Sequence, residues 1–422
     1  MRSLTIIATL LLSIFIARGA DPTDTSYSFQ QCEGSAMPYP VPAESVTLPD
    51  SLTAVFINHV GRHGARFPSS PKNVTTLIRE LAKADSAKAL TPAGEELLTL
   101  AKFVSETSRN RWGALDSLGM AEQRGIASRM FRNYGMLFND TRINAISSYS
   151  PRCVMSMYEF THQLDRLNNH IEITTSSGRQ NSPLMRPFDL DSDFIEWAKS
   201  GDWKAAYKML FETMMPTASA RKLFKSEYAK EMTNDDARKV SYHAFKLLQE
   251  LSAMGLPSKM ERYFTREEAN QAWSCTNLSH YLERTASTLS TLPAEIAAPL
   301  LTDLLTTAEA AVEGKQQYAV MLRFNRRISC VQVTPRISVS LFAFCSRRSV
   351  SNRTCVRKAI CEDSFACIFS FAARVPVSTD EISIMKNVTG YPTAYVSKDI
   401  LGSIRKKQNK NTLKKEPATL QR

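Results

Sequence analysis

Short apolar runs alternate with segments of helical periodicity in the first third of the chain. The runs 54–58 and 143–148 are bounded by polar or turn-forming residues, and this pattern predicts two buried strands. Thr91, followed by proline, marks the start of a helix toward residue 107, because threonine caps helices and proline suits their first position. A second helix is predicted over 120–133. Alternating strands and helices favour an α/β fold, with ligand sites at the carboxyl ends of the strands.

Residues 191–312 show helical periodicity throughout. Thr265 and Glu268 have the spacing of a capping box, which marks the start of a helix. We therefore expect an α-helical cap at 191–312, inserted into an α/β core that spans 21–190 and resumes as a strand within 313–324. One predicted cap helix carries an apolar stripe at helical spacing, formed by Val240, Ala244, Leu247, Leu248 and Leu251.

The first twenty residues have the pattern of a secretory signal peptide. Arg2 precedes an apolar run over 4–17, and Gly19 and Ala20 are small enough for cleavage. The run is short for a bilayer, since a spanning helix takes about 20 apolar residues. We expect removal of 1–20 and a mature protein that is secreted, periplasmic or in the lumen of the secretory pathway, without stable membrane insertion. An uncleaved anchor is the alternative.

Charge and cysteine content change sharply after Phe324. Residues 325–422 carry 18 Lys and Arg against 6 Asp and Glu, whereas the preceding part carries 35 of each, and five of the eight cysteines lie in this tail. A shifted reading frame or an incorrect gene structure is the favoured interpretation, and a genuine divergent region is the alternative. A tail that binds nucleic acid or membranes is least favoured, because its basic residues show no helical stripe. Its end, 405–422, is expected to be disordered.

The segment Arg-His-Gly-Ala-Arg-Phe-Pro, directly after the first predicted strand, carries the candidate chemistry. Imidazole can attack phosphorus as a nucleophile, and guanidinium groups hold phosphate oxygens in pairs. His63 is therefore the candidate nucleophile, and Arg62 and Arg66 form a candidate phosphate clamp. Arg152, after the second strand, is the candidate third arginine of this clamp, and Lys72 is a candidate contact to a further phosphate. The alternative role of the arginines is in surface ion pairs, and the alternative for Lys72 is a solvated side chain.

Two further features concern histidine and metal ligands. His59 precedes the segment and is expected in the core or behind the site. No residue spacing typical of a metal site is found, because the cysteines lack a paired Cys-x-x-Cys arrangement. The sequence leaves disulfide connectivity and oligomeric state open.

These motifs resemble those of the histidine acid phosphatases, in the large branch that includes phytases and multiple inositol polyphosphate phosphatases. The segment at 62–68 resembles the family signature, and Pro-Lys-Asn at 71–73 and Ser-Pro-Arg-Cys at 150–153 resemble later family segments. The resemblance extends from about residue 30 to Phe324. A four-residue recurrence similar to this group also lies on a predicted cap helix, where packing is the favoured role, at Trp273, Asn277 and Tyr281.

The resemblance implies a phosphomonoesterase that needs no metal or organic cofactor and acts on a small phosphorylated molecule. Inositol polyphosphates such as phytate are the implied substrates, with 2,3-bisphosphoglycerate as a second. His63 would carry the phosphoryl group until water removes it. No nucleic-acid partner is implied.

The resemblance also exposes a gap. In the family, a strand ending in Leu-Arg-Phe leads into Gly-His-Ala-Glu, whose histidine binds phosphate and whose glutamate protonates the leaving oxygen. Here Phe324 is followed by Asn-Arg-Arg-Ile, and none of the six histidines lies downstream. The proton donor is therefore unidentified, and activity is expected to be weak or absent. A catalytically inactive relative that binds phosphorylated ligands is the alternative.

Overall fold

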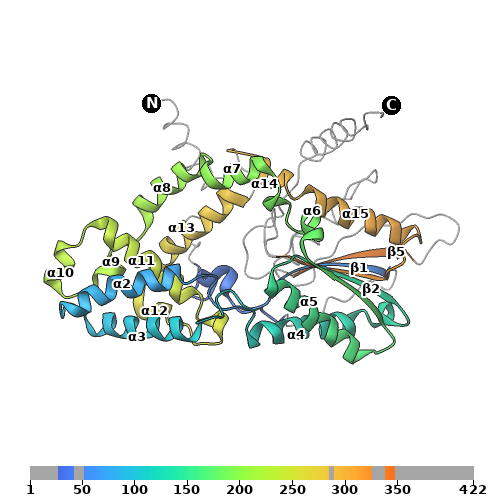
Figure 1. Cartoon of the computed structure of the whole chain (residues 1–422), viewed down its shortest axis with the longest axis horizontal. Coiled ribbons are helices and arrows are strands. Elements are labelled where there is room, and N and C mark those ends of the chain that lie inside the picture. Colours follow the sequence, from blue (N-terminus) through green and yellow to red (C-terminus); the bar gives the residue numbers. More distant parts are fainter. Residues whose placement is uncertain (1–26, 42–51, 285–288, 326–337, 347–422) are drawn as a thin grey trace, which may run out of the picture.

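The computed structural model describes residues 27–41, 52–284, 289–325 and 338–346. The predicted signal peptide and most of the basic tail lie outside these ranges. A helical part and a part built on a β-sheet lie side by side along the long axis of the molecule (Figure 1). This arrangement confirms the expected α/β core with an α-helical cap.

A five-stranded sheet has the strand order β3-β2-β4-β1-β5. The first four strands in this order are parallel, and β5 pairs antiparallel with β1 at the edge. The three runs predicted as strands correspond to β1, β2 and β4. The strands are β1 (Leu52–Arg62), β2 (Arg142–Ser147), β3 (Glu172–Ser177), β4 (Val320–Asn325) and β5 (Ser338–Ser346).

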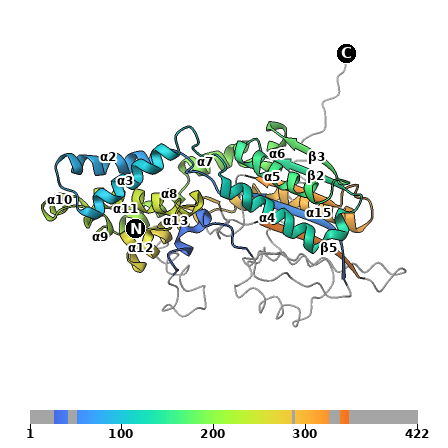
Figure 2. The same ribbon diagram turned by 90° about the horizontal axis from the view of Figure 1, so that it is seen from below.

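Helices cover both faces of the sheet (Figures 1 and 2). α4 (Ser117–Asn133) and α5 (Pro151–Leu167) pack on one face, and α15 (Ala298–Val312) lies against β1 and β5 on the other. Short segments complete this part of the chain: η2 (Gly135–Phe138), η3 (Arg179–Asn181), α6 (Ser182–Met185), η4 (Pro187–Asp189) and α14 (Leu292–Glu295).

The helix starts follow from local capping. Thr91 caps α3 (Pro92–Thr107) as predicted, because its hydroxyl accepts a hydrogen bond from the Gly94 amide at 3.3 Å. α4 begins three residues earlier than predicted, because the carboxylate of Asp116 accepts a hydrogen bond from the Gly119 amide at 2.7 Å. The predicted capping box is also present, with the Thr265 amide donating to the Glu268 carboxylate at 2.8 Å.

The helical part has its own apolar core, to which all five residues of the predicted stripe contribute; four lie on α11 (Asn234–Gln249), and Leu251 follows its end. α2 (Lys72–Ser86) and α3 also bury their apolar sides here, although their sequence positions fall within the predicted core range 21–190. The division by residue range stays a prediction. The remaining helices are α7 (Ser192–Ser200), α8 (Trp203–Met214), α9 (Ala218–Arg221), α10 (Ser226–Glu231), η5 (Ser252–Met254), α12 (Met260–Tyr263) and α13 (Arg266–Arg284). Each helix of the described ranges is too short or too polar to cross a membrane.

Residues 27–41, which include η1 (Gln31–Ala36), connect the two parts. On the helical side, the Gln249 amide donates to the Cys32 carbonyl at 2.7 Å. Trp273 packs over Gly34, where a side chain could not fit, because a Cβ atom would lie 2.2 Å from the indole ring. On the sheet side, the Tyr39 amide donates to the Glu122 carboxylate at 2.8 Å. The segment therefore fixes the helical part relative to α4.

His59 lies inside the core between the sheet and α5. Its ring is fully buried, 5.1 Å from that of Phe160 and 5.8 Å from that of Phe324 between ring centroids. This is one of the roles that the sequence favoured for it. Because burial disfavours the charged imidazolium, it lowers the pKa of His59 to about 3.

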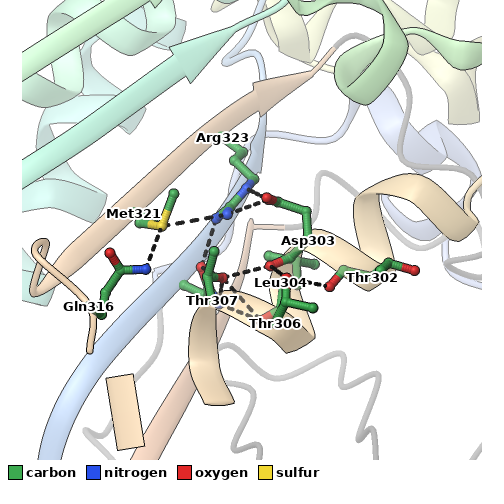
Figure 3. Close-up of polar contacts among 9 residues, drawn as sticks. Thr302, Asp303, Leu304, Thr306, Thr307, Gln316, Met321 and Arg323 are labelled. Carbon is green, nitrogen blue, oxygen red and sulfur yellow. Dashed lines mark hydrogen bonds and ion pairs between the residues drawn. The ribbon is translucent and has the colours of Figure 1, made fainter. Parts of the chain in front are cut away.

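On the opposite face of the sheet, β4 is fixed by an ion pair between a fully buried arginine and a partly exposed carboxylate (Figure 3). The guanidinium of Arg323, which is fully buried, donates to the Asp303 carboxylate of α15 at 2.7 Å and to the Asn58 side-chain oxygen of β1 at 2.7 Å. The Asn58 amide in turn donates to the Leu304 carbonyl at 2.8 Å. Arg323 therefore joins β4, β1 and α15 at one point.

The Arg323 ion pair generates a stability prediction. Arg323→Met should lower the free energy of unfolding by about 3 kcal/mol, because it leaves Asp303 and Asn58 without their charged donor. Urea denaturation measures this loss. The control is Arg142→Met, which removes an ion pair with Glu172 whose side chains are 58% and 63% exposed. This control should change stability by less than about 1 kcal/mol. Equal losses in both variants would contradict a structural role for the Arg323 network.

His59 generates a pH prediction. Between pH 6.5 and 3 the unfolded chain protonates this histidine and the folded chain does not, so stability falls as pH falls. From pH 7.5 to 5, wild type should lose about 2 kcal/mol more unfolding free energy than His59→Leu, which cannot titrate. Urea titrations at both pH values measure the difference. His59→Phe should behave like His59→Leu. If both variants keep the wild-type pH slope, His59 does not carry the linked proton.

Candidate active site

The signature segment begins at the carboxyl edge of the sheet. Arg62 is the last residue of β1 and pairs in register with Asn325, the last residue of β4. Just beyond β2, the Ser148 amide donates to the Phe324 carbonyl at 3.0 Å. The ends of β1, β4 and β2 therefore lie together, and His63 and Arg152 follow two of them.

Two glycines allow the signature loop to pack against the start of α4. A Cβ atom on Gly64 would lie 2.3 Å from the Gly119 carbonyl oxygen, and one on Gly119 would lie 2.2 Å from that of Ala65. Neither position can accept a side chain without moving the backbone. The Asp116 amide donates to the Ala65 carbonyl at 3.1 Å, and the Ala65 amide donates to the Glu122 carboxylate at 2.6 Å. The loop is thus held on both sides of Ala65.

α5 holds the other side of the loop. The Gly64 amide donates to the Ser156 hydroxyl at 3.2 Å, and this hydroxyl donates to the Arg152 carbonyl at 2.8 Å. The Arg152 side chain donates to the Gly113 carbonyl at 3.2 Å. A single serine therefore connects the signature loop to the first turn of α5, where Arg152 lies.

His63 has the tautomer that a nucleophile requires. Its Nδ1 lies 2.8 Å from the Gly64 carbonyl oxygen, which can only accept, so Nδ1 carries the proton and Nε2 carries the lone pair. The side chain is 96% buried, at 4% exposure. Burial, followed by the charges of Arg62, Arg66 and Arg152, holds the pKa of His63 well below its ordinary value. The neutral form of the imidazole is therefore favoured.

The charges that lower the pKa of His63 come from three of the residues predicted for the site. Arg62, Arg66 and Arg152 all act on His63, although Arg152 lies 89 positions further along the chain. Lys72 does not belong to this group. It is exposed at the start of α2, where its charge acts on His243 of α11 instead. A role for Lys72 at the clamp would require contact with a distant part of a larger ligand.

Two charged residues near the clamp were not predicted. Glu250, directly after α11, forms an ion pair with Arg66, with 3.3 Å between the carboxylate oxygen and Nη1. Lys246 lies one turn earlier; burial lowers its pKa, and Glu250 opposes this effect. The available sequence signal was the polar character of Lys246, Gln249 and Glu250 at the end of an otherwise apolar stripe.

Among the described residues that hold the signature loop, none can replace the missing acid. Both carboxylate oxygens of Glu122 accept backbone N–H groups, and Asp116 caps α4. Asn325 is 97% buried beside Arg62, at 3% exposure, and its amide is not an acid. Positions 326–328, where the family motif would continue, lie outside the described residues. Among the described residues, no group of three or more His, Cys, Asp or Glu side chains could hold a metal ion.

Comparison with solved structures gives similar folds. The multiple inositol polyphosphate phosphatase of Bifidobacterium longum in complex with inositol hexasulfate has a TM-score of 0.63 at 13% identity, over 76% of this chain and 90% of that one. Its phosphate complex has a TM-score of 0.62 at 14% identity, over 76% and 89%. The phytase from D. castellii has a TM-score of 0.54 at 16% identity, over 79% and 80%. No curated protein matches the chain.

Family comparison covers most of the chain. The model of the histidine phosphatase superfamily (branch 2) matches residues 55–343, a range that includes the signature loop, Arg152 and β4. The similar folds extend over both the sheet and the helical part. The protein therefore belongs to branch 2 of the histidine phosphatase superfamily.

Proposed function

We propose that this protein is a phosphomonoesterase that works through a phosphohistidine at His63. The observation that carries the proposal is the buried imidazole of His63, whose Nδ1 donates to the Gly64 carbonyl and whose pKa is lowered by burial and by the charges of three arginines. In the first step Nε2 would attack phosphorus, and the bond from phosphorus to the leaving oxygen would break. In the second, water would attack the phosphohistidine and release inorganic phosphate.

The arginines suit this reaction because phosphoryl transfer depends on positioning and on neutralising charge. Arg62 and Arg66 follow from the end of β1 and Arg152 from the segment after β2, and the charges of all three act on His63, so together they could hold the oxygens of one phosphoryl group. The family match and the phytase-like folds support phosphatase activity.

Inositol polyphosphates are the proposed substrates. The similar B. longum structures contain inositol hexasulfate and phosphate, which suit a site for a ring carrying several anionic groups. In this chain, Lys246 and Arg284 add positive charge on the side of the helical part. 2,3-Bisphosphoglycerate is a proposed second substrate, because it also carries more than one phosphate.

The missing acid should determine which phosphate esters react. An inositol alkoxide is a poor leaving group and needs a proton, and general acid catalysis typically contributes about 10²–10⁴-fold. p-Nitrophenolate leaves without a proton. The arginine clamp and the nucleophile would then suffice for aryl phosphates but not for phytate.

We expect the protein to hydrolyse p-nitrophenyl phosphate, and we expect this activity to disappear in His63→Ala. The same protein should hydrolyse phytate about 10²–10⁴-fold more slowly than p-nitrophenyl phosphate. Released phosphate and the acid-labile phosphohistidine both report the reaction. The matched gain-of-function variant is Asn325→Gly, Arg326→His, Arg327→Ala, Ile328→Glu, which should raise phytate turnover far more than aryl phosphate turnover. Aryl phosphate hydrolysis that survives His63→Ala would exclude the proposed nucleophile.

A second candidate function is binding of a phosphorylated ligand without turnover. The observation in its favour is Asn325 beside Arg62, at the point where the acid-bearing motif of the family begins. Such a protein would show phytate-dependent thermal stabilisation that needs Arg62 and Arg66, but would release no phosphate from either ester.

A further inference from the structure

Arg66 shares its guanidinium between two acceptors. Its Nη1 donates to the Phe67 carbonyl at 2.8 Å and lies 3.3 Å from the carboxylate oxygen of Glu250. The two charged side chains are each 15% exposed, so water screens their attraction less than it would at the surface. The carboxylate therefore binds the guanidinium that the proposed clamp would use to hold a phosphate oxygen.

The position of Glu250 is locally unfavourable. It is the residue directly after α11, at the C-cap position, and its own amide donates back to the Leu247 carbonyl at 3.1 Å. A helix carries partial negative charge at this end, so a carboxylate here is repelled by the helix. Arg66, which belongs to the signature loop, provides the opposing attraction.

A second cation lies within reach of Glu250. Lys246 is one helical turn earlier on α11, a spacing at which side chains meet, and its ammonium now donates to the Gln249 side chain at 2.7 Å. Glu250 already raises the pKa of Lys246 against the lowering by burial, Arg66 and Arg284. If Glu250 leaves Arg66, its charge can still be balanced on the same helix.

We propose that Glu250 determines the affinity of the clamp by competing with phosphate for Arg66. This inference rests on the proposed function, because it requires that Arg66 binds a phosphate oxygen. A phosphate oxygen and the carboxylate are both anionic acceptors for Nη1. A bound phosphate must either displace Glu250 toward Lys246 or tolerate its repulsion, and either outcome weakens binding.

The competition also couples ligand binding to the helical part. Glu250 follows α11, whereas Arg66 lies in the loop after β1, so their ion pair links the two parts at the site itself. A phosphate bound to Arg66 would replace its ion pair with Glu250, so this connection between the two parts would be lost. The connection through residues 27–41 does not depend on it, because it uses Gln249, Cys32 and Trp273.

Isothermal titration of inorganic phosphate into the full-length chain tests the proposal. Glu250→Gln keeps the shape of the side chain and removes its charge, and it should tighten phosphate binding by about three- to tenfold. The gain should shrink at high salt, which screens the repulsion. Glu250→Ala should show a gain in the same direction, and circular dichroism establishes that both variants fold.

The matched control is Glu96→Gln. Glu96 lies on α3 in the helical part and pairs with Arg262 at 3.2 Å and Lys259 at 3.6 Å, away from the clamp. This control makes the same change in net charge and should leave phosphate affinity within about twofold, because exposed charges are screened over distance.

Three outcomes would overturn the inference. Unchanged affinity in Glu250→Gln would show that the carboxylate does not compete, and weaker affinity would show that it positions Arg66 for phosphate instead. An equal gain in Glu96→Gln would assign the effect to net charge. In each case wild-type binding that requires Arg62 and Arg66 leaves the proposed function intact. Absence of that wild-type binding would remove the clamp and the inference together.

Discussion

The candidate site depends on a contact between two backbones, with no side chain between them. Gly64 of the signature loop and Gly119 of α4 approach so closely that neither position has room for a Cβ atom. This approach brings Ala65 within reach of Asp116 and Glu122, which bind its carbonyl and its amide. It also fixes the Gly64 carbonyl that determines which nitrogen of His63 is protonated. The geometry of the nucleophile is thus a consequence of packing rather than of the imidazole itself.

The charges of the site create a requirement that the packing alone does not meet. Burial, and then the charges of Arg62, Arg66 and Arg152, lower the pKa of His63, because a further positive charge at this place is costly. Hydrogen-bond acceptors and negative charge offset this cost. The Gly113 and Phe67 carbonyls provide acceptors, and the Glu250 carboxylate provides a negative charge. A phosphoryl group would be a stronger acceptor for the same donors, so the arrangement that stabilises the protein also selects the ligand.

The sequence predicted those parts of the site that follow from chain-local rules. His63, Arg62 and Arg66 share one segment, and Arg152 joins them because the carboxyl ends of parallel strands meet at one edge of a sheet. The place of Glu250 and Lys246 near the clamp does not follow from a shared segment or from the ends of the strands. They come near the clamp because the end of α11 lies beside Arg66, and on the helix their polar character follows an apolar stripe without indicating a partner. For the same reason, the packing of α2 and α3 with the helical part could not be read from their place among the core segments. Side-chain capping explains the smaller difference at α4, whose first turn depends on Asp116.

The resemblance to the family ends after Phe324, and the register of the strands shows which part of the site this affects. β1 and the segment after β2 supply the groups that would hold a phosphoryl group, whereas β4 would deliver the family's acid beside Arg62. The Arg323 network keeps β4 in register up to Asn325, so the position at which the acid-bearing motif would begin is preserved even though its residues differ. The segments after β1 and β2 would therefore carry the arginines and the nucleophile, whereas the segment after β4 would carry the acid and one further phosphate contact. A change confined to the chain after Phe324 can remove the acid and that contact and leave the arginines in place, which is why binding and turnover have to be considered separately for this protein.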